Sequence, residues 1–204
     1  MAEELDGKLL IPDMDDATFE SAIVEAVVDG HALRIDFLTN VLGVRPNALE
    51  SSVVEILVPC QRNGQDGMAA IPLMHPLHCL QSRVANVIKL GRSDDVARRQ
   101  LEASPVVLRE YIAEALGSED TKEATRSLQR LYQYLRSDIY GRRAHDHMRR
   151  DPLELLKHFA ADERIDERFR RLSIGPMIDD LASRRETRAA NEERRQSARE
   201  PEKR

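Results

Sequence analysis

Residues 22–38 read AIVEAVVDGHALRIDFL, two alternating apolar runs joined at Asp29-Gly30. An Asp-Gly pair between two such runs is typical of a hairpin turn. In the second run Arg34 and Asp36 share one side of the strand, while Ile35 and Phe37 share the other. The stretch therefore predicts a β-hairpin that holds the carboxylate of Asp36 at one face of a sheet. We expect a central or near-central strand there, facing an open groove.

The remaining sequence up to residue 75 predicts more strands. Residues 1–12 are expected to end a helix or a loop. SVVEILV at residues 52–58 predicts a strand, Asn63-Gly64 a second hairpin turn, and residues 68–74 the returning strand. Pro72 restricts that last strand to an edge or to a strand end. Arg45-Pro46-Asn47 is interpreted as a loop.

From Pro76 the apolar spacing changes from two to about 3.6 residues, which predicts helices. Gly91 is expected to end the first helix and Gly117 a later one, while Ser104-Pro105 either kinks a helix or caps a new one. Gly175-Pro176 is expected to interrupt the last apolar stripe. The apolar positions of the first stripe are Leu77, Leu80, Val84, Val87 and Ile88.

These patterns predict an α+β fold, with a small mixed or antiparallel sheet followed by a helical domain and a mobile C-terminal tail. We expect a sheet region over residues 1–75, a helical region over 76–182 and a charged tail over 183–204. Beyond Ser183 the only apolar residues are alanines. That segment cannot bury enough surface to fold by itself, so it is predicted to be disordered or a loose helix, and dispensable.

Composition limits the classes of function. The 204 residues carry a net charge of −5, with 33% charged and 4% aromatic residues, which argues against a surface that binds nucleic acid everywhere. The sequence contains no apolar run of membrane-spanning length and no signal-peptide pattern, so we expect a cytoplasmic protein without a membrane partner. Cys60 and Cys79 are too few for a disulfide framework or a four-cysteine zinc site.

LRIDFL at residues 33–38 resembles the strand that carries the third metal-binding carboxylate in nucleotidyltransferase-like families. These belong to the DNA polymerase beta-type superfamily, which includes abortive-infection toxins. IPLMHPLHCLQSRVANVIKLG at residues 71–91 and ARRQLEAS at 97–104 resemble the back part of uncharacterised bacterial proteins of that type. The resemblance covers roughly residues 5–135, and residues 80–86 are its most distinctive part.

The resemblance implies nucleotidyl transfer from an NTP with Mg²⁺ as the cofactor. It makes Asp36 the catalytic and metal-binding carboxylate, and it places Arg83 and Asn86 on a helix beside the nucleotide. Such families open with a Gly-Gly or Gly-Ser turn and an Asp-x-Asp strand, and nothing before residue 36 supplies both. Asp13 and Asp15 have the spacing but follow Pro12 without that turn, so they are weak metal candidates. We therefore expect this chain to be incomplete or inactive as a transferase.

Other interpretations remain open. The chain is equally read as a non-catalytic interaction or regulatory module of the same fold, with a protein partner or a missing N-terminal segment beside it. A third reading is a nucleic-acid-binding partner that uses the basic run from Arg136 to Arg150. Asp36 has a simpler interpretation too, as a surface charge paired with Arg34 or His31. His75 and His78 are interpreted as ordinary polar residues at a helix start.

Overall fold

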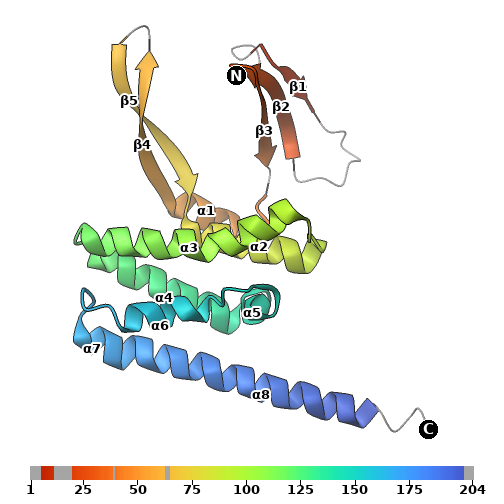
Figure 1. Ribbon diagram of the computed structural model, residues 1–204, viewed down its shortest axis with the longest axis vertical. Coiled ribbons are helices and arrows are strands. Elements are labelled where there is room, and N and C mark those ends of the chain that lie inside the picture. Colours follow the sequence, from red (N-terminus) through yellow and green to blue (C-terminus); the bar gives the residue numbers. More distant parts are fainter. Residues whose placement is uncertain (1–5, 12–19, 39, 63–64, 200–204) are drawn as a thin grey trace.

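The computed structural model describes residues 6–11, 20–38, 40–62 and 65–199. It contains two small antiparallel sheets followed by a helical region, so the α+β fold class is confirmed. Figure 1 shows both sheets projecting from the same side of the helical part, and α8 forming the layer farthest from them.

The first sheet has the strand order β1-β2-β3 and is antiparallel throughout. Its strands are β1 (Lys8–Leu10), β2 (Glu20–Val28) and β3 (His31–Leu38). Asp29 and Gly30 have φ angles of 50° and 77°, the two positive values that a tight turn between twisted strands requires. The hairpin is thus confirmed. However, β2 is the central strand and β3 lies at an edge, so the expected central position of Asp36 is wrong. Residues 8–10 also form a strand where the end of a helix or a loop was predicted.

The second sheet is a two-stranded ribbon of β4 (Val53–Arg62) and β5 (Gln65–Met74). Asn63-Gly64, predicted as its turn, lies outside the described residues. The register pairs Ile56 with Ile71 on one face and Leu57 with Ala70 on the other, and three of these four side chains, those of Ile56, Leu57 and Ile71, are large and exposed. The ribbon is therefore apolar on both faces. The short helix α1 (Pro46–Ser51) precedes it, where a loop was predicted; Pro46 starts this helix because its fixed φ suits a first turn.

The first two long helices are α2 (Pro76–Leu90) and α3 (Asp95–Gly117). Gly91 ends α2 with a φ of 63°, as predicted. α3 is a single helix that contains Pro105, although proline removes the N–H that would bond the carbonyl of Leu101. The hydroxyl of Ser104 donates to that carbonyl instead, at 2.7 Å. The Ser-Pro pair thus neither ends this helix nor starts a new one.

The C-terminal half continues as helices without a further strand in the described residues. Gly175-Pro176 does not break the helical path. The residues before it form a π-helical turn, in which the N–H of Gly175 donates a hydrogen bond to the carbonyl of Arg170. The last helix runs on to Arg199, through the described part of the predicted tail. The elements are α4 (Thr121–Ser137), η1 (Gly141–Arg143), α5 (Ala144–His147), α6 (Leu153–Ala160), α7 (Glu167–Phe169), η2 (Arg170–Ile174) and α8 (Gly175–Arg199).

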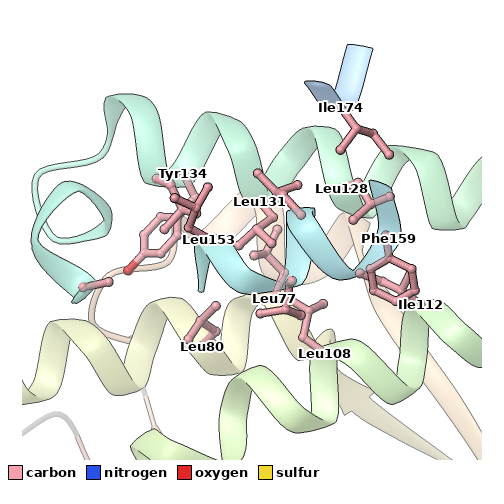
Figure 2. Packing of buried hydrophobic residues seen from close by; sticks show 14 of the residues in the cluster. Leu77, Leu80, Leu108, Ile112, Leu128, Leu131, Tyr134, Leu153, Phe159 and Ile174 are labelled. Carbon is pink, nitrogen blue, oxygen red and sulfur yellow. The ribbon is translucent and has the colours of Figure 1, made fainter. Parts of the chain in front are cut away.

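One hydrophobic core lies among the helices and includes side chains from α2 through α8, from Leu77 to Leu181 in the sequence. Figure 2 shows part of this cluster. Helices α2, α3, α4 and α6 each contribute fully buried side chains, and burying each one contributes about 1.5–3 kcal/mol. In the stripe predicted for α2, the first three residues are buried and the last two are partly buried. Core side chains labelled in the figure include Leu80, Leu108, Ile112, Leu128, Leu131, Phe159 and Ile174.

Candidate functional site

The structure places Asp36 on an exposed face of β3. Its Oδ1 accepts a hydrogen bond from Nε of Arg34 at 2.8 Å, and Nη1 of Arg34 lies 3.9 Å from Oε1 of Glu25 on β2. All three side chains are 40–53% exposed. Asp36 is therefore a member of a solvent-facing charge cluster, the pairing with Arg34 that one interpretation of the sequence expected.

The described residues do not supply a set of ligands for a two-ion centre. Nowhere in the described ranges do three or more His, Cys, Asp or Glu side chains gather closely enough to hold a metal. Asp13 and Asp15 lie outside those ranges. Each ion in a two-metal centre needs several oxygen ligands at short range, and the carboxylates of Asp36 and Glu25 are too few and lie on either side of Arg34. The residues seen thus do not fit the Mg²⁺ that the resemblance implies.

Arg83 and Asn86 lie on α2, and both are half-buried. Arg83 lies near the thiol of Cys79; burial raises the pKa of that thiol, and the positive charge of Arg83 opposes the rise. The carbonyl of Asn86 accepts the N–H of Gly91 and so closes the helix. Within the described residues, no hydrogen bond or ion pair links either side chain to Asp36. The three predicted site residues are thus not joined into one site by direct contacts.

His75 has a structural role at the start of α2. Its Nδ1 accepts the N–H of Leu77 at 3.0 Å, so the proton must sit on Nε2, which lies 3.3 Å from Oε1 of Glu123 on α4. Glu123 also accepts from the hydroxyl of Ser127 at 3.0 Å. Burial lowers the pKa of His75, although Glu123 opposes this. Both ring nitrogens are occupied, so this histidine ties α2 to α4 and has no lone pair left for a metal or a proton.

A cationic groove of about 830 Å³ lies between the end of α4, the η1–α5 segment and one side of α8. We call it the arginine groove, because seven arginines and two carboxylates line it. The charged residues are Arg136, Arg142, Arg143, Asp146, Arg184, Arg185, Arg188, Glu192 and Arg195. The run from Arg136 to Arg150, which is visible in the sequence, contains the first of these residues. The arginines of α8 lie in the segment predicted to be a tail, so the sequence did not indicate their part in a site.

The helical period explains why α8 lines the arginine groove along one side. Arg184, Arg188, Asn191 and Arg195 follow one another at spacings of four, three and four residues, which places them on one side of a helix. That periodicity is a signal that could have been read from the sequence. The periodicity is easily missed, because buried helix faces are recognised by apolar residues and this stripe is charged.

Ion pairs hold α8 against the rest of the groove. Arg185 forms a two-pronged pair with Asp151, in which Nη2 lies 2.9 Å from Oδ1. Arg188 lies 3.0 Å from Oδ2 of Asp146 and donates to the carbonyl of Arg142 at 2.9 Å. Burial alone would raise the pKa of Asp151, but the hydrogen bonds from Arg185 and from the N–H of Leu153, together with the positive charge of Arg185, hold that pKa below its ordinary value. The groove is thus assembled by contacts between distant segments.

Three arginines of the groove remain available to a ligand. Arg142, Arg143 and Arg195 are exposed, and their side chains have no hydrogen bond or ion pair with any other described residue. By contrast, Arg184 and Arg136 both bind Asp180, at 2.8 and 3.4 Å. The groove therefore combines fixed arginines, which shape it, with free ones that can bind an anion.

Comparison with protein-family models, with curated proteins and with solved structures found no match. Among the described helices, none has both the length and the apolar composition needed to cross a lipid bilayer.

Proposed function

We propose that this chain binds the phosphate backbone of a nucleic acid through the arginine groove. The observation that carries the proposal is the convergence of seven arginines from α4, the η1–α5 segment and α8 on one groove that has only two carboxylates in its lining. Guanidinium groups bind phosphates through paired N–H donors, so several of them in one groove favour a ligand with successive phosphates.

The charge distribution supports a localised site. The whole chain carries a net charge of −5, whereas seven arginines and two carboxylates line the arginine groove, so the groove is a local exception that attracts a polyanion. Each phosphate neutralised releases counterions, and the three free arginines correspond to a salt slope of about −2 to −3 in log K against log [salt]. This modest slope distinguishes binding in the groove from coating of the whole surface.

The test is fluorescence anisotropy with labelled oligonucleotides at low and moderate salt. The variant Arg142→Ala/Arg143→Ala/Arg195→Ala should lose at least about tenfold in affinity and most of the salt slope. A matched control, Arg92→Ala/Arg98→Ala/Arg99→Ala, removes three exposed arginines near the start of α3 and changes net charge equally. Equal losses in both variants, or no binding by the unaltered chain at low salt, would contradict the proposal.

Nucleotidyl transfer from an NTP, the activity that the resemblance to nucleotidyltransferase-like proteins implies, is the alternative to test. Its support is that Asp36 stands on an exposed strand face ahead of α2, which carries Arg83 and Asn86. Because a single carboxylate cannot hold two ions, we expect no transfer from any labelled NTP with Mg²⁺ or Mn²⁺. Robust transfer that Asp36→Ala abolishes would establish the activity and make Asp13 and Asp15 the next residues to test. Transfer that survives Asp36→Ala would exclude Asp36 as the metal ligand.

A further inference from the structure

We infer that the arginine groove takes a single nucleic-acid strand, with bases inserted, in preference to a duplex; this inference rests on the proposed function. It is based on an exposed apolar side chain in the lining of the groove. Ile139, between α4 and η1, lines the groove and is 62% exposed, whereas Leu135 and Leu181, which also line it, are buried in the core. Phosphate binding alone gives the exposed side chain of Ile139 no role, whereas an unstacked base would cover it.

The shape of the site favours the same ligand. The groove holds about 830 Å³, within the range of roughly 300–1,000 Å³ that encloses a small organic ligand. A single strand can turn its bases into the groove while its phosphates contact the exposed arginines. A duplex keeps its bases stacked inside and presents a convex phosphate surface. Its phosphates would contact the exposed arginines, but it would place no base against Ile139.

The side chains divide into two roles. Arg142, Arg143 and Arg195 are the free cations and bind phosphates, while Ile139 covers the face of a base. Asn191 on α8 also lines the groove, and its amide has no hydrogen bond with another described residue, so it can donate to and accept from a base edge. None of the described lining residues is aromatic. Bases can therefore stack only on guanidinium planes or pack on Ile139, which any base can do, so binding is tolerant of sequence.

The length of the site sets the size of the ligand. Arg184 and Arg195 are eleven residues apart on α8, which corresponds to about 16 Å along the helix axis. That distance spans a few nucleotides of a strand. A twelve-nucleotide probe thus fills the site with flanking chain to spare, and a mononucleotide fills only part of it.

The experiment compares four probes on the full chain at one salt concentration: twelve-nucleotide single strands of RNA and of DNA, and duplexes of the same sequence. We expect at least one single strand to bind tenfold or more tightly than its duplex. Ile139→Ser should weaken the single-strand complex about fivefold and leave the duplex complex unchanged. Val107→Ser, which alters another exposed apolar side chain on α3, serves as the control and should change neither.

The outcomes separate the two proposals. If duplex and single strand bind equally, or if Ile139→Ser has no effect, the inference about the strand is wrong while backbone binding in the groove stands. If no probe binds, the proposed function itself fails. If ATP alone displaces the strand at equal concentration, the site takes a mononucleotide and the inference is wrong. Because Ile139 is exposed, an unchanged thermal midpoint in Ile139→Ser shows that lost binding does not come from lost folding.

Discussion

Arg185→Ala should destabilise the protein, although the residue lies in a segment that composition marks as dispensable. The side chains of Arg185 and Asp151 are 22% and 28% exposed, and two hydrogen bonds join them. Exposed ion pairs contribute at most about 1 kcal/mol, whereas breaking a buried pair costs about 3–5 kcal/mol. For this half-buried pair we expect a loss of about 2 kcal/mol, which lowers the thermal midpoint by roughly 4–8 °C at this chain length.

The pH dependence of this loss follows from the lowered pKa of Asp151. A carboxyl group with a lower pKa in the folded state stabilises the fold above its unfolded pKa, near 3.9, and loses that contribution as the pH falls through the folded pKa. The difference in unfolding free energy between the parent and Arg185→Ala should thus be full at pH 7 and shrink toward pH 3. Urea titrations at a series of pH values measure it.

Two controls sharpen the test. Arg184→Ala removes a neighbouring arginine whose pair with Asp180 is more exposed, and it should cost less than about 1 kcal/mol. A chain that ends at residue 190 keeps the Arg185 pair and should melt like the full chain, whereas one that ends at residue 183 should lose several degrees. An unchanged midpoint for Arg185→Ala, or a loss just as large in acid, would refute this account of how α8 is held.

Three further predictions concern the helical core. Leu128→Ala removes a fully buried side chain and should cost about 2–5 kcal/mol in urea unfolding; a cost below 1 kcal/mol would mean that α4 is not in the core. Gly141→Ala should lower the thermal midpoint by several degrees, because its new Cβ would overlap the backbone carbonyl oxygen of Tyr134; a variant as stable as the parent would argue against this turn. Since the pKa of His75 is lowered, stability should fall as the pH drops below about 6.5, and His75→Asn, which keeps a capping group, should flatten that slope. A slope unchanged in His75→Asn would assign the titration to another group.

Local signals in the sequence were enough to predict the hairpin and α2. Asp29-Gly30 fixes a turn through its own backbone preferences, and Pro76 and Gly91 mark the two ends of a helix without help from the rest of the chain. The position of β3 at a sheet edge could not be predicted in this way, because strand order depends on which distant segment pairs with it. Only the pairing of residues 8–10 with β2 makes β2 central.

For the candidate site too, only the part that is contiguous in the sequence could be predicted. The basic run from Arg136 to Arg150 is contiguous and can be read directly. The pairing of Arg185 with Asp151 joins residues 34 positions apart, and neither residue belongs to an apolar pattern that would indicate burial. The high charge content after Ser183 predicts a solvated segment. Charge content alone cannot show whether an arginine is in water or is bound to a carboxylate across a groove.

The β4–β5 ribbon has a consequence for how the protein behaves at high concentration. Both faces are apolar and both strands are edges, a combination that in general invites growth into fibrils. Each strand, however, contains one proline near its middle or end, Pro59 in β4 and Pro72 in β5, and a proline fits a ladder only where its missing N–H faces away from the partner strand. Each outer edge therefore lacks one donor. Aggregation of the concentrated protein should accordingly occur by contact between ribbon faces and give amorphous, reversible particles, rather than by addition of strands to a growing fibril.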